Sequence, residues 1–84
     1  DPAPADTAMW LLGHLRALHQ FYGPEQGLRI ARKHLGWYAQ RQPAASEFRA
    51  RINSATDIDA QYRMAEHYFL EDRVVVREQL PPAA

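Results

Sequence analysis

The chain has 84 residues, with ten Lys and Arg and ten Asp and Glu, so its net charge is zero when His is neutral. It contains no cysteine, which excludes disulfides, a thiolate nucleophile and Cys-ligated metal sites. The length allows one small domain with a modest core, and no apolar run approaches the roughly 20 residues of a membrane span. The beginning, DPAPADT, has neither a Met nor the basic and apolar parts of a signal peptide. We therefore expect a cytoplasmic protein, present here as a piece of a longer chain.

The first segment with helical periodicity follows a short linker. Residues 1–6 contain two prolines and no periodicity, and Asp6 or Thr7 is expected to cap the helix that follows. Apolar residues at spacings of three and four predict a wide buried face on this helix. They form two stripes, the first Leu11, Leu15, Leu18 and Tyr22, and the second Trp10, Ala17 and Phe21.

The string Phe21-Tyr22-Gly23-Pro24 predicts the end of one helix and the start of the next. Glycine accepts the left-handed conformation that closes a helix, and proline fits the first turn of a new one. The second helix is expected from about Pro24 to Gln40, because Pro43 disfavours helix beyond this point.

The second helix divides into an apolar and a basic side. Its apolar residues are Leu28, Ala31, Leu35 and Tyr38, flanked by Ile30, His34 and Trp37. Arg29 and Lys33 lie opposite them, and Arg32 lies at the edge of this polar side. Gly36, in the middle of the polar side, either lets a phosphate backbone approach closely or packs against another helix.

Two further helices are predicted. Ser46 is expected to cap a short third helix containing Phe48, Ile52 and Ala55. The sequence from Thr56 to Asp59 has the pattern of a capping box and predicts a fourth helix that ends near Asp72. The core face of this helix contains Ile58, Tyr62, Ala65 and Phe69.

These elements predict an all-α protein, a small four-helix bundle with short connections. The expected organisation is a linker at residues 1–6, a helical domain at residues 7–72 and a tail at residues 73–84. Within the tail, the β-branched run Val74–Val76 either extends as a short strand, packs on the bundle or stays loose.

Charge is unevenly distributed along the chain. From Arg16 to Arg51 there are seven bases and two acids, a net +5, whereas from Asp57 to Asp72 five acids face one base, a net −4. This asymmetry suggests that one face meets an anion. A carboxylate four residues before a base predicts the helix-surface pairs Glu25–Arg29, Glu47–Arg51 and Asp59–Arg63. The bases without such a partner are Arg16, Arg32, Lys33, Arg41 and Arg49, which either bind phosphates or serve as solubilising charge.

No catalytic motif is recognisable. The sequence lacks a nucleophile elbow, a phosphate loop and a dinucleotide fingerprint. His14 and His19 are five residues apart, a poor spacing for a shared metal on a helix, and His34 and His67 are likewise expected at the surface or the core edge. Most aromatic residues are expected in the core, and only Trp37 or Tyr68 is considered for stacking on bases.

The string FYG-x3-G-x-R-x-ARKH-x2-WY covers Phe21 to Tyr38. His14-Leu15 and Leu18 precede it, and Phe48-Arg49 and Ile52-Asn53 follow it. Together these residues resemble the C-terminal helical domain of bacterial tRNA-dihydrouridine synthases, most closely the B type, historically described as nitrogen-regulation proteins. The resemblance covers about residues 8–70.

In that family an N-terminal TIM barrel binds FMN and reduces a uridine in tRNA with electrons from NADPH, and the helical domain grips the tRNA. The resemblance therefore implies RNA binding by Arg29, Arg32, Lys33 and Arg49. This sequence holds neither the barrel nor its catalytic cysteine, so no catalytic, FMN-binding or metal-binding residue is implied here. Only the parent enzyme would be an oxidoreductase of tRNA processing.

Two alternatives to RNA binding stay open. The chain is also consistent with a protein-interaction module whose apolar edge docks a partner domain, such as the barrel of the parent enzyme, with its cations as ordinary surface charge. A small DNA-binding bundle is favoured less. Its first turn resembles a helix-turn-helix only loosely, and no helix carries Asn or Gln at base-reading positions.

Overall fold

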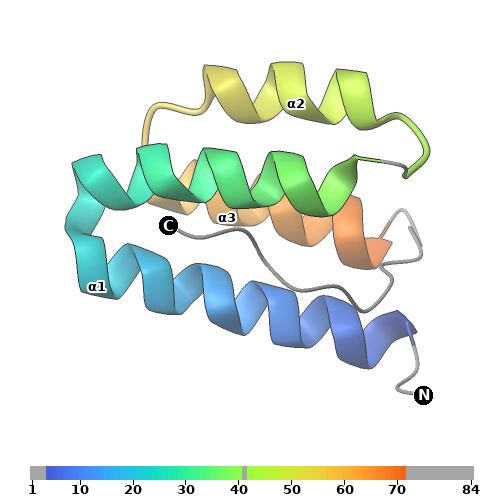
Figure 1. Cartoon of the computed structure of the whole chain (residues 1–84), viewed down its shortest axis with the longest axis horizontal. Coiled ribbons are helices and arrows are strands. Elements are labelled where there is room, and N and C mark those ends of the chain that lie inside the picture. The colour runs from blue at the N-terminus through green and yellow to red at the C-terminus, as the bar shows by residue number, and fades with distance from the viewer. Residues whose placement is uncertain (1–3, 41, 72–84) are drawn as a thin grey trace.

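The computed structural model describes residues 4–40 and 42–71 (Figure 1), with side chains described for residues 8–40 and 42–70. This part of the chain is entirely helical apart from short connections, which confirms the predicted all-α class. It contains three α-helices and not the four that we predicted. They are α1 (Pro4–Ala39), α2 (Ala45–Ser54) and α3 (Ile58–Glu66), and the π-helix η1 (His67–Glu71) follows directly.

The difference in helix number comes from a kink within α1. Gly23 has φ 85° and ψ 178°, a conformation open essentially to glycine alone, and Pro24 follows it. The predicted break is therefore at the expected residues: two helical segments meet at the non-helical Gly23, and α1 comprises both of them. We call residues 4–22 arm 1 and residues 24–39 arm 2. The chain reverses at Gly23, so that arm 2 runs back beside arm 1.

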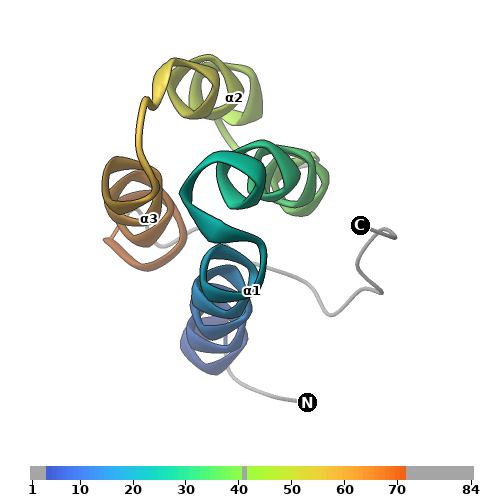
Figure 2. The same ribbon diagram turned by 90° about the vertical axis from the view of Figure 1, so that its left-hand side faces the viewer.

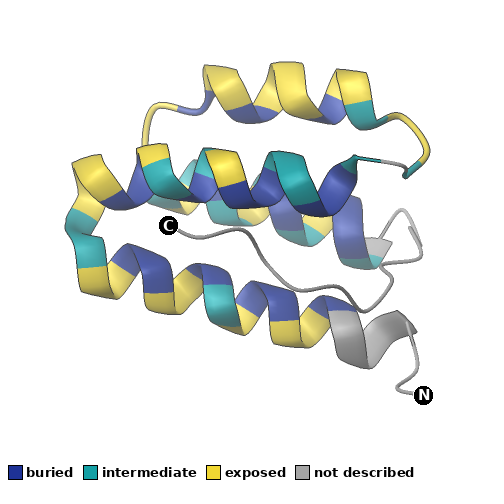
Figure 3. Cartoon of the chain, viewed as in Figure 1, coloured by how far each residue is buried: buried dark blue, intermediate teal, exposed yellow. Residues whose placement is uncertain are grey.

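The two arms and the two shorter helices surround one core. Figure 2 shows arm 2 between α2 above and arm 1 below, with α3 to the left of the two arms. The buried sides of all of them face inward (Figure 3). Phe48 of α2 stacks on Tyr68 of η1, with ring centroids 4.0 Å apart. The core cluster includes Leu11, Leu15, Leu35, Tyr38, Phe48, Ile52 and Phe69.

A close crossing of the arms next to the kink requires Gly27. A Cβ atom at Gly27 would lie 3.1 Å from Cα of His19 and 3.2 Å from the carbonyl oxygen of Leu18. Both neighbours are backbone atoms of arm 1, which cannot rotate out of the way. The second glycine of the FYG-x3-G string therefore serves the contact between the arms.

A buried polar group holds both arms to α3. Gln61 is fully buried, and its Nε2 donates to the carbonyl oxygen of Leu28 at 3.0 Å. Its Oε1 lies 2.6 Å from Nε2 of His19, which must donate because an amide oxygen only accepts. Gln61 thus joins arm 1 to arm 2 close to the kink.

The helix ends differ from the predicted ones. α1 begins at Pro4, so Asp6 and Thr7 lie within its first turns and are not its cap. The cap of α2 is Ala44, in the left-handed conformation, and Ser46 makes no capping bond. The cap of α3 is Asp57, one residue after Thr56, and its Oδ1 accepts from the amide of Ala60 at 2.8 Å.

The helix predicted to end near Asp72 has two parts: α3 stops at Glu66, and the π-helix η1 continues it to Glu71. Val74–Val76 and the predicted tail at residues 73–84 lie outside the described residues. None of the helices described is long and apolar enough to cross a membrane.

Candidate nucleic-acid interface

Two of the four cations implied in RNA binding are exposed on the outer side of arm 2. Arg29 and Lys33 are four residues apart, so their side chains leave the helix on the same side, about 6 Å apart along its axis. No acidic side chain among the described residues lies within ion-pair distance of either one. The predicted surface pair Glu25–Arg29 does not form.

The third cation, Arg49, reaches the same side of the molecule from α2. Its Nη2 donates to the carbonyl oxygen of Gly36 at 3.4 Å, and a Cβ at Gly36 would lie 3.8 Å from its Nε. The polar stripe of arm 2 is thus open at Gly36, and an exposed arginine side chain of α2 lies across it. Of the two interpretations of Gly36, helix packing is the one with a contact in the structure.

The fourth cation, Arg32, has a different environment. It is half-buried, and its Nη2 donates to the carbonyl oxygen of Ala55, where α2 ends, at 3.1 Å. Its Nε is buried and has no hydrogen-bond partner. We call the exposed cations Arg29, Lys33 and Arg49 the basic face, and Arg32 lies beneath the edge of this face.

The remaining cations have other environments. Arg16 lies 3.7 Å from Asp59 and places its guanidinium 3.9 Å from the ring centroid of Tyr62, so it binds arm 1 to α3. Asp59 therefore pairs with Arg16, and the predicted pair Asp59–Arg63 does not form. The pair Glu47–Arg51 also does not form, and Arg51 is exposed. Arg41 lies outside the described residues.

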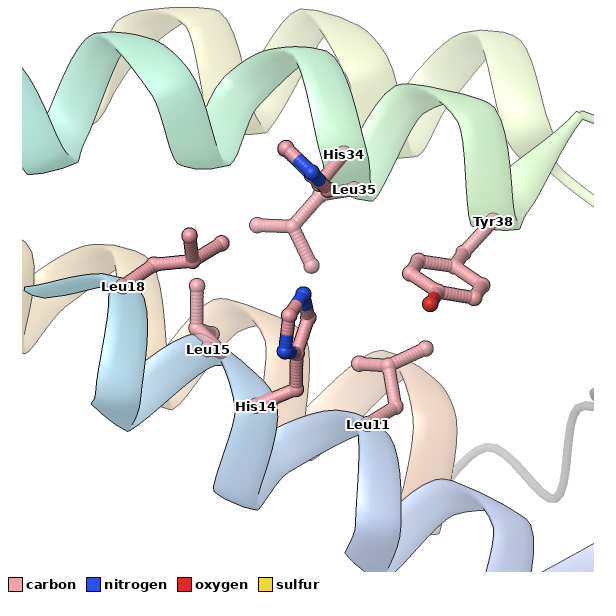
Figure 4. A pocket seen from close by; sticks show the side chains of 7 residues that line it. All are labelled: Leu11, His14, Leu15, Leu18, His34, Leu35 and Tyr38. Carbon is pink, nitrogen blue, oxygen red and sulfur yellow. The ribbon is translucent and has the colours of Figure 1, made fainter. Parts of the chain in front are cut away.

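A small apolar cavity of about 10 Å³ lies where the two arms face each other (Figure 4). It is lined by Leu11, His14, Leu15, Leu18, His34, Leu35 and Tyr38. The rings of His14 and His34 are 5.7 Å apart, and Trp10 stacks on His14. Burial, together with the neighbouring His34, lowers the pKa of His14, which favours a neutral imidazole in the folded state.

This histidine pair lacks a third ligand for a metal. Nowhere in the described part of the chain do three His, Asp or Glu side chains come together. His34 Nδ1 bonds the carbonyl oxygen of Ile30 within its own helix at 3.1 Å. His14 is thus a core-edge residue, as predicted, whereas His19 and His34 are buried.

The aromatic residues depart most from the sequence-based expectation. Tyr68, which we considered for base stacking, is buried, and its hydroxyl donates to the carbonyl oxygen of Pro43 at 2.7 Å. Trp10 and Phe21, which we placed in the core, have 54% and 81% of their surface exposed. Together with Met9, at 64%, they give arm 1 an apolar outer side. Helical spacing alone did not reveal this surface, because it cannot tell which of two apolar stripes is covered.

The comparisons with known proteins point to one family. A family model described as dihydrouridine synthase (Dus) matches residues 2–73. A tRNA-dihydrouridine synthase B of Xanthomonas axonopodis pv. citri is 59% identical over 68 residues, which are 81% of this chain and 20% of that protein. The proteins of that name from Pseudomonas putida and Escherichia coli are 49% and 44% identical, over 86% and 81% of this chain and 22% of each relative. No solved structure matches the chain.

The chain therefore belongs to the dihydrouridine synthase family. Among its relatives it is similar to the proteins named tRNA-dihydrouridine synthase B. It spans about a fifth of the length of these curated relatives.

Proposed function

We propose that this chain is the tRNA-binding helical domain of a flavin-dependent tRNA-dihydrouridine synthase in the cytoplasm. The observation that carries the proposal is the basic face: Arg29, Lys33 and Arg49 are exposed on one side of two adjacent helices, without carboxylate partners among the described residues. Such cations bind nucleic-acid phosphates by releasing counterions, independently of sequence. We take the nucleic acid to be tRNA because the relatives are named tRNA-dihydrouridine synthases.

In the proposed enzyme, a catalytic barrel outside this chain binds FMN, takes electrons from NADPH and reduces the uridine. The cavity between the arms, about 10 Å³, is far smaller than an isoalloxazine ring. The role of this domain is to hold the tRNA backbone and thereby to fix its orientation.

A titration of the chain with tRNA at 50 and 200 mM salt tests the proposal. Three phosphate contacts predict that the dissociation constant rises roughly 20- to 40-fold between these concentrations. The double variant Arg29→Gln/Lys33→Gln is expected to bind more weakly. The rise in its dissociation constant between the two salt concentrations should be about ninefold smaller than that of the unmodified chain. Both residues are exposed, so their replacement should leave the helical content unchanged.

Arg51→Gln is a matched control, because Arg51 is exposed on the same helix as Arg49. On a helical wheel the two arginines are roughly 200° apart and flank the buried residues Phe48 and Ile52 on opposite sides. The control is expected to bind as the unmodified chain does. Absence of binding at 50 mM salt, or equal losses in the control and the double variant, would contradict the proposal.

The apolar side of arm 1 favours a second function that is compatible with the first. Trp10, Ala17 and Phe21 share one side of the helix, and both aromatic residues are more than half exposed. Large aromatic side chains contribute most to protein interfaces when buried there. We propose that this side docks the catalytic domain, since about four fifths of the relatives' length lies outside this chain.

This second function is tested by calorimetry with the remaining part of the Xanthomonas relative, produced as a separate polypeptide. Phe21→Ser is expected to weaken binding at least tenfold, because buried aromatic anchors typically cost more than 1–2 kcal/mol (about tenfold or more) when truncated. Arg29→Gln serves as the control and should have no effect. Binding that weakens steeply with salt would contradict apolar docking.

A further inference from the structure

Arg32 connects arm 2 to the point where α2 passes into α3. Its bond partner, the carbonyl oxygen of Ala55, belongs to the residue at which α2 ends in an extended conformation, φ −64° and ψ 129°. Two residues later Asp57 caps α3. The guanidinium of Arg32 therefore holds the connection between α2 and α3 against arm 2.

The contact of Arg49 with Gly36 is the other polar link between α2 and arm 2. Arg32 and Gly36 are four residues apart on arm 2, whereas Arg49 and Ala55 are six residues apart on α2. The two contacts constrain how far α2 lies along arm 2, in addition to the packing of Phe48 and Ile52 in the core. Without the link at Ala55, the long and exposed side chain of Arg49 depends on a single weak bond of 3.4 Å for its place beside Gly36.

We infer that Arg32 is a positioning residue, which holds the end of α2 on arm 2 and so keeps Arg49 on the basic face. Arg29, Lys33 and Arg49 then contact the phosphates. This inference rests on the proposed tRNA binding, and it reassigns one of the four cations that the resemblance implies in direct contact. The half-buried guanidinium supports it, because turning toward a phosphate would leave the carbonyl oxygen of Ala55 without its donor.

The test uses Arg32→Lys, which keeps the positive charge. A lysine side chain ends about one bond short of Nη2 and lacks the planar fork of arginine. A direct phosphate contact would tolerate this exchange, whereas the bond to Ala55 would be lost. Arg51→Lys makes the same exchange at an exposed site of α2 that lies outside the basic face, and it is the matched control.

Each lost phosphate contact lowers the change in affinity between 50 and 200 mM salt by about threefold. We expect both Arg32→Lys and Arg49→Gln to lower this change in affinity by about threefold. The double variant Arg32→Lys/Arg49→Gln should lose no more than Arg49→Gln alone, because both act through one contact. Arg51→Lys should keep the full salt dependence.

Three outcomes are distinguishable. Normal salt dependence in Arg32→Lys, or additive losses in the double variant, would overturn the role of Arg32 while leaving tRNA binding intact. Absence of tRNA binding by the unmodified chain would overturn the proposed function and the inference with it. Circular dichroism at the assay temperature shows whether each variant is folded.

A second measurement needs no variant. In NMR spectra of the arginine side chains, the Nε–H signal of Arg32 in the unmodified chain is expected to stay in place when tRNA is added. The signals of Arg29 and Arg49 should shift. A shift of the Arg32 signal as large as that of Arg29 would contradict a positioning role.

Discussion

The two arms of α1 pack against each other, yet their outer surfaces are of opposite kinds. Arm 1 exposes Met9, Trp10 and Phe21, and Arg16, the one lysine or arginine among its described residues, is engaged by α3. Arm 2 exposes Arg29 and Lys33 without a partner in the described part of the chain. One kinked helix can thus present an apolar and a cationic surface at the same time, provided that the kink fixes how the arms face each other.

The variant expected to disturb this arrangement most is Gln61→Ala. It removes the bond to the carbonyl oxygen of Leu28, leaves the buried Nε2–H of His19 unsatisfied and opens a cavity. An unsatisfied buried donor costs about 1–3 kcal/mol, and the cavity adds to this cost. We expect a loss of about 3 kcal/mol or more in the free energy of unfolding, measured with urea. A loss below about 1 kcal/mol would show that Gln61 does not hold the arms together.

Gly23→Ala tests the kink itself. Alanine at φ 85° and ψ 178° is strained, and such strain costs about 1–3 kcal/mol. The matched control is Gly13→Ala on the exposed side of arm 1, where an added Cβ meets nothing within 4 Å. This control should stabilise the helix by up to about 1 kcal/mol. Thermal unfolding of both variants gives the comparison, and equal effects would refute the role of the kink.

Acid is expected to weaken the contact between arm 1 and α3. Burial is the main cause that lowers the pKa of His19 from its usual 6.5, and its Nδ1 has no partner for a second proton. The unfolded chain therefore binds more protons than the folded one as the pH falls below 6.5. The stabilising contribution is complete above pH 6.5 and is lost as the pH falls through the lowered pKa. Urea unfolding at pH 7.5, 6.5 and 5.5 measures this trend, and constant stability would contradict it.

Phe21→Ser should have the smallest effect on stability. The side chain is 81% exposed and its ring lies against that of its neighbour Tyr22, so the free energy of unfolding should change by no more than about 0.5 kcal/mol. An effect this small would show that the apolar side of arm 1 is not part of the core, as the proposed docking requires. A loss above about 1.5 kcal/mol would indicate that Phe21 stabilises this chain itself.

Local signals in the sequence predicted the helices well. Gly23 and Pro24 marked the reversal of the chain, because each restricts the backbone by its own covalent structure. The apolar positions of arm 2, Leu28, Ala31 and Leu35, are buried as their spacing predicted. The caps were predicted less accurately. The predicted caps of α2 and α3 were two residues and one residue away from the observed ones, and α1 begins before Asp6 and Thr7. Thr56 and Asp57 both carry suitable oxygens, and only the backbone conformation decides between them.

The details of the basic face depended on tertiary contacts that spacing does not contain. Arg32 has no partner within a helical turn, yet it bonds Ala55, 23 residues away. Asp59 has Arg63 at ideal helical spacing, but Arg16 of arm 1 engages it. In both cases the partner comes from another helix, so the sequence predicted which side chains are cationic but not which of them are free to meet a ligand.

The sharp turn at Gly23 also bears on the order in which the chain folds. The arms meet after closing a very short loop, whereas Gln61 must find Leu28 and His19 across 33 and 42 residues. Loop closure costs more entropy as the loop lengthens, and local contacts form sooner than distant ones. We therefore expect the helical hairpin of α1 to be present in the transition state and α3 to join late. Gln61→Ala should then mainly speed unfolding in stopped-flow experiments and leave the refolding rate almost unchanged.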